Sequence, residues 1–268
     1  MSRIQHVLDK AELEGAIRRT RTLGGTGGRD ILPERLSRTS PGTPTAAQLT
    51  AERPRRVVAP TLEARLVAQT APVGSAAEQY RALRTRLGLL DRHGSSQVLL
   101  VTSPGPGEGR SLTAANLALT MGQDHERRIC ILDADLRRPN QHALFGVPQT
   151  PGLCDVVLGR AALDDAIVEI GHCDIAMLPA GTVPAHPAEL LGTNAVHRVV
   201  QALRGRFDCV LVDAPAVAPL ADIAILSPLV DAIVVVVRAG QTEKPAIRDA
   251  IAALDPARFI GVVLNDIR

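Results

Sequence analysis

The chain has 268 residues, of which 46% are hydrophobic, and it carries a formal net charge of +2. This length can enclose one sizeable core with some chain left over, and so small a charge favours neither a nucleic acid nor an acidic surface as partner. The apolar stretch over residues 232–237 is too short to cross a membrane. The four cysteines form no C-x-x-C pair and no N-terminal segment resembles a signal peptide. We therefore expect a cytoplasmic protein without a bound metal cluster.

Residues 1–74 have the composition of an appendage to a fold. Apolar residues recur at helical spacing from Ile4 to Ala11, which predicts an amphipathic helix over residues 2–20, either docked on a partner or frayed on the surface. Residues 21–73 are rich in Gly, Pro, Thr and Arg without an apolar period, which is typical of a flexible linker. The first 74 residues hold 12 Arg and Lys against 7 Asp and Glu, whereas the rest holds 18 against 21. A basic leader thus precedes a mildly acidic body.

The remainder, residues 75–268, predicts one folded domain. A helical pattern begins at Ser75 and places Leu83, Leu87 and Leu90 on one face; short β-branched runs then alternate with helical stretches. The predicted strands lie at residues 97–103, 128–134, 174–180, 208–214, 231–239 and 259–265. Most of them are apolar on both faces, as strands buried between two helical layers must be. We therefore predict an α/β fold with a doubly wound, mostly parallel sheet, whose ligands bind at the carboxyl ends of the strands.

A glycine-rich loop, SPGPGEGRS, follows the first of these strands and runs into a helical segment. In that context the glycines let backbone N–H groups converge on a phosphate at the positive end of a helix. We expect a fold of the P-loop NTPase type, with an ordinary strand-to-helix connection as the alternative. The candidate cofactor-binding residues are Pro106, Gly107, Glu108, Gly109, Arg110, Ser111 and Leu112. A P-loop usually ends in Gly-Lys-Ser/Thr, so Arg110 stands where a lysine would reach the terminal phosphates.

Two further strands end in carboxylates. The segment ICILDADLRRP delivers Asp133 and Asp135 on one side of a strand tip, and CVLVDAP ends its strand with Asp213. Carboxylates beside a phosphate suit Mg²⁺, held directly or through water. We expect Ser111, Asp133 and Asp213 to organise the metal. Either Asp133 or Asp135 would accept the proton of an attacking hydroxyl or water, unless these two carboxylates only cap the loop or face solvent.

These motifs make the segment from Ser75 to Asn265 similar to the cytoplasmic domain of the bacterial tyrosine kinases that control polysaccharide polymerisation and export. SPGPGEGRS resembles the Walker A motif of that family, ILDADLRRP its additional Walker A′ motif, and VLVDAP its Walker B motif. GTVPAHPAELL and GVVLND resemble its Pro-rich turn and last strand. The resemblance implies ATP and Mg²⁺ as cofactors and an adenine contact at Asn265. The candidate catalytic residues are then Arg110, Asp133 and Asp135.

The resemblance also implies partners. The family works with an inner-membrane polysaccharide co-polymerase of the chain-length determinant type, and the basic leader would help to hold a cytoplasmic protein at the periphery of that membrane. Glu78, Arg81 and Arg84 match the E-x-x-R-x-x-R pattern through which the family assembles rings. The same charges could instead be used within one helix, because Glu78 and Arg81 are three residues apart.

The sequence departs from the family at several positions. Arg110 replaces the lysine of the P-loop, and a planar guanidinium prefers bidentate partners whereas an ammonium acts as a point charge. Lysine occurs only twice among the 30 basic residues, so the arginine bias alone could account for Arg110. Tyr80 is the only tyrosine, and no tyrosine-rich tail follows the last strand, so we do not expect such a tail to be phosphorylated. We interpret His186, which precedes Pro187, as a helix-entry residue rather than a catalytic base.

Three functions from different classes stay open at this point. The first is a kinase-like enzyme that phosphorylates a partner's tyrosine or regulates export through ATP-driven ring assembly. The second is a catalytically impaired pseudokinase that serves as a scaffold on the co-polymerase. The third is a positioning ATPase of the partition and septum-site type, which shares the fold. That group carries an additional lysine near the start of its P-loop, and its membrane-targeting members end in an amphipathic helix; this sequence has neither feature.

Overall fold

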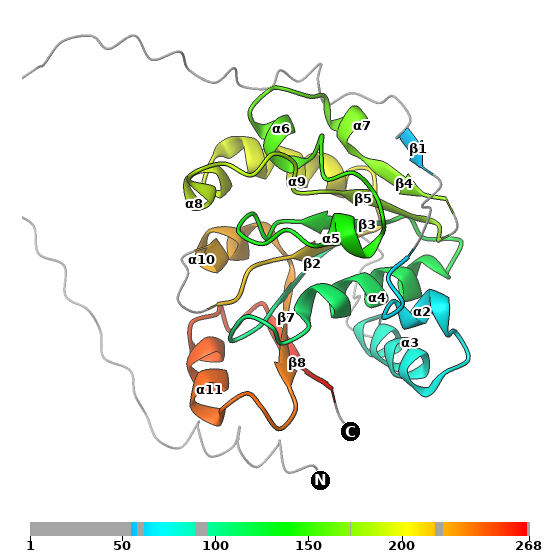
Figure 1. Ribbon diagram of the computed structural model, residues 1–268. Helices are drawn as coiled ribbons and strands as arrows, with labels where there is room; N and C mark the ends of the chain where they lie inside the picture. Colours follow the sequence, from blue (N-terminus) through cyan, green and yellow to red (C-terminus); the bar gives the residue numbers. More distant parts are fainter. Residues whose placement is uncertain (1–54, 58–61, 89–95, 172, 218–221, 267–268) are drawn as a thin grey trace, which may run out of the picture. The chain divides into compact units, whose positions relative to one another are not determined.

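The computed structural model describes residues 55–57, 62–88, 96–171, 173–217 and 222–266 (Figure 1). The amphipathic helix that the sequence predicts over residues 2–20, and most of the linker after it, lie outside the described residues. So does Leu90, the last member of the predicted apolar face.

An eight-stranded sheet runs through the centre of the structure, in the order β1-β4-β5-β3-β6-β2-β7-β8. The strands are β1 (Arg55–Val57), β2 (Gln97–Thr102), β3 (Ile129–Asp133), β4 (Val168–Ile170), β5 (Ile175–Leu178), β6 (Cys209–Asp213), β7 (Ala232–Arg238) and β8 (Phe259–Asn265). Every neighbouring pair is parallel except β4 with β5. Because β3, β6 and β2 are parallel neighbours, their carboxyl ends meet at one edge of the sheet.

Helices cover both faces of this sheet (Figure 1). They are α2 (Val67–Thr70), α3 (Ser75–Gly88), α4 (Arg110–Gly122), α5 (Gln141–Leu144), α6 (Leu153–Val157), α7 (Leu163–Ala166), α8 (Pro187–Leu191), α9 (Asn194–Arg204), α10 (Asp222–Leu226) and α11 (Lys244–Ala252), with a 3₁₀ turn at Ser227–Leu229. On one face, α2, α3, α4 and α5 share a hydrophobic cluster with the strands; on the other, α6 to α11 share a second cluster. The predicted doubly wound α/β arrangement is therefore confirmed.

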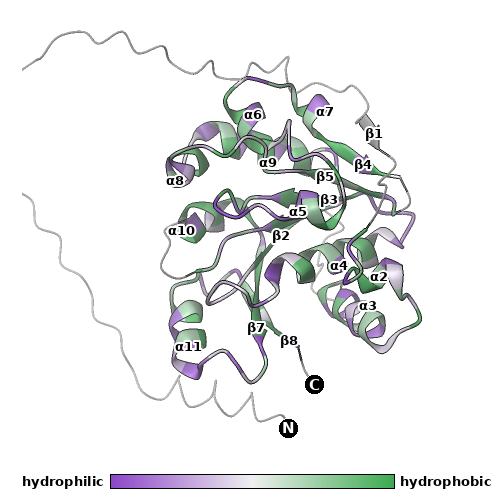
Figure 2. Ribbon diagram, viewed as in Figure 1, coloured by the Kyte–Doolittle hydropathy of each residue, from purple (hydrophilic) through white to green (hydrophobic). Residues whose placement is uncertain are grey.

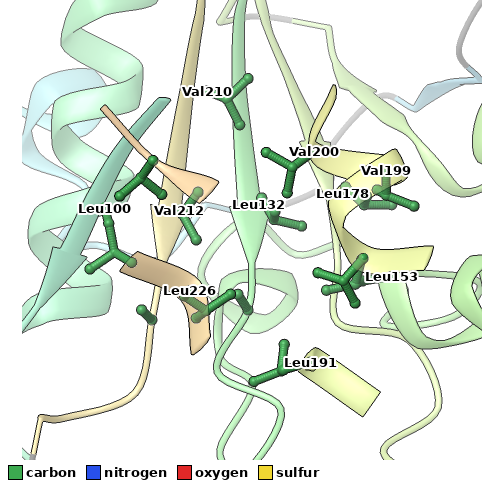
Figure 3. Packing of buried hydrophobic residues seen from close by; sticks show 14 of the residues in the cluster. Leu100, Leu132, Leu153, Leu178, Leu191, Val199, Val200, Val210, Val212 and Leu226 are labelled. Atoms are coloured by element: carbon green, nitrogen blue, oxygen red, sulfur yellow. The ribbon is translucent and has the colours of Figure 1, made fainter. Parts of the chain in front are cut away.

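Strand β2 shows why the sequence folds into two helical layers. Side chains alternate between the faces of a strand, so Val98 and Leu100 join one cluster while Leu99 and Val101 join the other, and all four are buried. The apolar residues of the central strands are visible in the hydropathy colouring of Figure 2. Figure 3 shows one face of the sheet, where residues of the strands meet residues of the helices: Leu100, Leu132, Leu178, Val210 and Val212 with Leu153, Leu191, Val199, Val200 and Leu226.

Each strand that the sequence predicts is present, with its ends shifted by no more than a few residues. The two strands that sequence reasoning missed, β1 and β4, are three residues long each and lie at one side of the sheet. A run of three residues is too short to show the period of two that identifies a strand. The predicted helix beginning at Ser75 is confirmed as α3, and Leu83 and Leu87 pack against the core below it.

The packed part of the chain begins before Ser75. Leu66 and Ala68 are fully buried, and the backbone N–H of Ala68 donates to Asn116 Oδ1 at 3.0 Å. Asn116 Nδ2 also donates to the carbonyl of Arg65 at 3.1 Å. One buried amide on α4 thus fixes the segment that leads into α3. The division expected at Ser75, between a linker and a folded domain, stays a prediction.

We predict that Asn116→Ala loosens the segment around Ala68. The change leaves the buried N–H of Ala68 and the partly buried carbonyl of Arg65 without this partner, which costs about 1–3 kcal/mol. Urea unfolding should show this loss, and hydrogen exchange of the Ala68 amide should accelerate more than the global loss of stability explains. Thr85→Ala, at an exposed position of α3, is the control. An unchanged exchange rate at Ala68 would contradict the prediction.

Candidate functional site

Three motifs that lie far apart in the sequence meet at the carboxyl edge of the sheet. The P-loop connects β2 to α4, the A′ motif follows β3, and the Walker B motif ends β6 (Figure 1). Asp133 is the register partner of Asp213, which in turn pairs with Val101 of β2. The sheet therefore brings the predicted phosphate loop and the predicted carboxylates together.

The P-loop has the backbone conformation that a phosphate cradle requires. Gly107 and Gly109 lie in the left-handed region, with φ of 80° and 89°, and α4 begins at the next residue, Arg110. A side chain at position 109 would also place its Cβ 2.0 Å from Asn265 Nδ2. The backbone conformation favours glycine at this position, and any side chain here would displace the Asn265 amide from its place against the loop.

Glu108 ties this loop to the ends of β7 and β8. Its side chain is buried, and Oε2 accepts a hydrogen bond from the backbone N–H of Arg238 at 2.7 Å and another from the Thr242 hydroxyl. Its carbonyl oxygen accepts a hydrogen bond from Asn265 Nδ2 at 3.0 Å. Sequence reasoning selected Glu108 only for its backbone N–H group. No local signal in the sequence pairs Glu108 with Thr242, which is 134 positions away.

We predict that Glu108→Ala destabilises the protein by about 1–3 kcal/mol, because the partly buried N–H group of Arg238 and the Thr242 hydroxyl lose a charged acceptor and keep only the longer hydrogen bonds between those two residues. The loop that Glu108 holds should also bind nucleotide more weakly. Urea unfolding and calorimetric titration with ADP measure the two effects. The control, Glu126→Ala, removes an exposed carboxylate and should change neither the free energy of unfolding nor the affinity for ADP. If Glu108→Ala behaved like this control, the proposed role of the Glu108 carboxylate in holding the loop would be contradicted.

The Ser111 side chain lies close enough to the Asp213 carboxylate to lower the pKa of that carboxyl. Gln141, the first residue of α5, joins them: its Nε2 donates to Asp213 Oδ2 at 2.8 Å and to the Ser111 carbonyl at 3.0 Å. Sequence reasoning identified Ser111 and Asp213 but missed Gln141. Its only sequence signal is its place eight residues after Asp133, just beyond the end of the A′ motif.

Asp133 completes this group from the neighbouring strand. Its Oδ2 accepts hydrogen bonds from the backbone N–H groups of Asn140 and Gln141, each at 3.0 Å. Burial, followed by the neighbouring charge of Asp213, raises the pKa of Asp133 well above its usual value. Burial also raises the pKa of Asp213 to about 6, against hydrogen bonds from Gln141 and Ser111 that lower it. The structure therefore holds two fully buried carboxylates side by side.

The residues present fit a small divalent cation. Asp133 Oδ1 and Asp213 Oδ1 are buried and have no hydrogen-bond partner, and oxygen atoms are the ligands that Mg²⁺ prefers. Among the described residues, no three His, Cys, Asp or Glu side chains form a metal cage. Mg²⁺ in nucleotide sites usually takes only one or two carboxylates and completes its coordination with phosphates and water. The arrangement suits that mode of binding.

The raised pKa of Asp213 predicts how stability depends on pH. The unfolded carboxyl releases its proton near pH 4, whereas the folded one holds it to about pH 6, so the free energy of unfolding falls as the pH rises through this window. Asp213→Asn removes the buried charge. In metal-free buffer it should raise the free energy of unfolding by about 1–3 kcal/mol at pH 7.5 and by much less at pH 4.

Urea unfolding of wild type and Asp213→Asn at both pH values provides the measurement. Exposed Asp165, changed to Asn, serves as the matched control and should leave the difference between the two pH values as in wild type. If Asp213→Asn lowered the free energy of unfolding equally at both pH values, the predicted cost of ionising the buried Asp213 carboxyl would be contradicted.

Arg110 and Asp135, two of the candidate catalytic residues, bind each other. The Arg110 guanidinium forms an ion pair with Asp135 Oδ2, and only 10% and 2% of the two side chains are exposed. The other carboxylate oxygen, Oδ1, accepts the backbone N–H groups of Arg137 and Arg138 at 3.2 and 3.0 Å. Both oxygens of Asp135 are therefore occupied. The Arg110 guanidinium, which the sequence predicts to reach the phosphates, is instead bound to Asp135 of the A′ motif.

On α3, the candidate assembly residues make contacts within this chain. Arg81 Nε donates to Glu78 Oε2 at 2.8 Å, and Arg84 Nη1 donates to the carbonyl of Thr120 at 2.8 Å. The local alternative that the sequence left open for Glu78 and Arg81 is therefore present in the structure. His186 directly precedes α8 and is exposed, as expected for a helix-entry residue.

The fold and the site together define a protein of the P-loop NTPase class. No family model matches the chain. Among curated proteins, tyrosine-protein kinase YwqD of Bacillus subtilis is 32% identical over 206 residues, which cover 76% of this chain and 86% of YwqD. Putative tyrosine-protein kinase CapB of Staphylococcus aureus is 27% identical over 196 residues, with 72% and 86% covered. The chain belongs to the family of bacterial tyrosine-protein kinases.

Solved structures agree with this assignment. The kinase domain of Escherichia coli tyrosine kinase ETK aligns with a TM-score of 0.72 and 28% identity over 75% of this chain and 80% of that domain. The chimerical protein CapA2B2 aligns with the same TM-score and 26% identity over 82% and 96%. The septum site-determining protein MinD of Pyrococcus horikoshii, in complex with Mg-ADP, reaches 0.51 and 24% over 63% and 70%. That likeness reflects the shared fold alone.

Among the described helices, none has the length and apolar composition that a membrane crossing requires.

Proposed function

We propose that this protein binds Mg·ATP in its P-loop and transfers the γ-phosphoryl group to a tyrosine, as a kinase-like regulator of polysaccharide polymerisation and export. The observation that supports this most is the pair of unpaired buried oxygens of Asp133 and Asp213, which lie on register partners of neighbouring strands beside Ser111 of the glycine-rich loop. A hydroxyl and carboxylates in this arrangement hold the metal of a nucleotide in P-loop enzymes.

Each site residue has a proposed role. The backbone N–H groups of residues 107–110 hold the β-phosphate, and Leu112 and Pro106 flank them. Ser111 and Asp213 hold the metal, which neutralises the charge that develops on the phosphates during transfer. Asp133, the carboxylate whose Oδ1 has no hydrogen-bond partner, prepares the attacking hydroxyl by accepting its proton. Asn265 uses Nδ2 for Glu108, so its Oδ1 is the atom that would accept from the adenine amino group.

The phosphate acceptor is proposed to be a tyrosine outside these 268 residues. Tyr80 is the only tyrosine in the sequence. Burial raises the pKa of its phenol, which lies close to Thr113 and Asn116 of α4. A phosphorylated Tyr80 would place at least one negative charge into the contact between α3 and α4. A tyrosine of a partner therefore fits the site better than Tyr80 does.

The proposed partner is an inner-membrane polysaccharide co-polymerase, at which the protein would act from the cytoplasmic side. The support is the resemblance of the motifs to those of kinases that work with such partners, together with the basic composition of residues 1–74. Self-association into a ring through Glu78, Arg81 and Arg84 is also proposed. It requires Glu78, whose side chain is 70% exposed, to exchange Arg81 of its own helix for an arginine of a neighbouring copy.

A pseudokinase scaffold is the second candidate, and one observation favours it. The ion pair between Arg110 and Asp135 withholds the P-loop cation from the phosphates and one carboxylate from the reaction. A positioning ATPase is less well supported, because the sequence lacks the additional P-loop lysine of that group.

We predict that Arg110→Lys accelerates release or transfer of the γ-phosphate by about 10²–10³-fold, the scale on which one well-placed charged donor changes a rate. A lysine is too short to keep the same ion pair with Asp135 and can act on the phosphates as a point charge. Calorimetric titration should show that wild type binds Mg·ATP. Release of phosphate and phosphorylation of a Tyr-containing polymer are then measured for both proteins.

The matched control is Arg86→Lys, at an exposed position of α3, which should behave as wild type. Binding of Mg·ATP with negligible phosphate release by wild type, restored in Arg110→Lys, would favour the pseudokinase. Absence of Mg·ATP binding in both would refute the proposed function.

A further inference from the structure

Gln141 connects all three motifs of the site, although none of them contains it. Its backbone N–H donates to Asp133 Oδ2 at 3.0 Å, and its side-chain Nε2 donates to Asp213 Oδ2 at 2.8 Å and to the Ser111 carbonyl at 3.0 Å. The residue is completely buried. A long polar side chain at this depth is costly unless its polar atoms are paired.

These contacts fix the orientation of the side-chain amide. Both partners of Nε2 are oxygen atoms that only accept hydrogen bonds when Asp213 is ionised. If the Gln141 amide were rotated by half a turn, its Oε1 would face Asp213 Oδ2 and the Ser111 carbonyl, and none of these three oxygens could donate a hydrogen bond. The assignment of Nε2 and Oε1 is therefore determined by the chemistry of the neighbours, and Oε1 must point away from Asp213 Oδ2 and the Ser111 carbonyl.

The other amide atom, Oε1, is a buried acceptor without a donor. The two carboxylates hydrogen-bonded to Gln141 have the same deficiency, since Asp133 Oδ1 and Asp213 Oδ1 are also buried and unpaired. A buried acceptor without a partner costs about 1–3 kcal/mol. Three such oxygens on residues that hydrogen-bond to one another indicate a ligand that brings either positive charge or several O–H donors.

We propose that Gln141 is a positioning residue for the divalent cation of the nucleotide. Its Oε1 accepts a hydrogen bond from a water molecule that the cation carries, while Nε2 holds Asp213 Oδ2 and so directs Oδ1 toward the cation. Mg²⁺ gives up its water reluctantly, so a neutral acceptor in its hydration shell suits it. This inference rests on the proposed binding of a metal nucleotide.

The test compares ADP binding with and without Mg²⁺, by calorimetry, for wild type, Gln141→Leu and Gln123→Leu. Leucine has nearly the same volume as glutamine but can neither hold Asp213 nor accept from water. We expect wild type to bind ADP more tightly with Mg²⁺, and Gln141→Leu to lose about 10–100-fold of that tightening, the range found for residues that orient metal ligands. Its affinity for ADP without metal should stay within about twofold of wild type. Gln123→Leu, which loses one side-chain hydrogen bond on the far end of α4, should match wild type.

A second measurement guards against a merely structural role. Direct titration with Mn²⁺, followed by electron paramagnetic resonance in the presence of ADP, should show weaker metal binding in Gln141→Leu at a temperature at which both proteins are fully folded. If the leucine variant does not fold, Gln141→Met, which has an unbranched apolar side chain, takes its place. Equal Mg²⁺ dependence in wild type and variant would refute the role of Gln141 while leaving the proposed function intact. Absence of any Mg²⁺ effect on ADP binding in wild type would refute the proposed function itself.

Discussion

The structure depends on holding two carboxylates, Asp133 and Asp213, side by side at the ends of neighbouring strands with almost no access to water. Such a pair opposes folding, since burial and mutual repulsion penalise the charged forms. The fold provides what compensation it can through the backbone N–H groups after Asp133 and the amide of Gln141 on Asp213. One oxygen of each carboxylate is left without a partner. A cation bound between the two carboxylates would therefore stabilise the folded protein.

The phosphate loop reaches its shape through contacts that are remote in sequence. Its left-handed glycines allow the turn, but the buried Glu108 carboxylate and the amide of Asn265 attach it to the carboxyl ends of β7 and β8. These strands lie on the opposite side of β2 from the strands that supply the carboxylates. The two halves of the site are therefore positioned independently, with β2 and the loop after it as the common element. Rigid placement of the amides and of the metal ligands is what phosphoryl transfer demands of a protein.

Arg110 separates this chain from the usual form of a P-loop kinase. The longer, planar guanidinium can reach across to Asp135, where a compact ammonium would act on phosphate as a point charge. The ion pair is nearly buried, so water and salt screen it less than they screen an ion pair on the surface. The mechanism therefore turns on whether nucleotide phosphates draw Arg110 away from Asp135. In an active kinase Arg110 would leave Asp135 and contact the phosphates, whereas in a scaffold the ion pair would persist.

The sequence by itself determined the parallel sheet, because continuous apolar runs cannot be satisfied unless helices cover both faces of the strands. It also identified the P-loop and the three carboxylates, since each lies at or just after the end of a recognisable strand. Only the tertiary structure decided which side chains meet there. Gln141, the Glu108 carboxylate and the partner of Arg110 depend on contacts between segments 25 to 134 positions apart. Local pattern carries no information about such pairs, whereas the register of β3 with β6 and the hydrogen bonds of α5 to both strand ends fix the site in space.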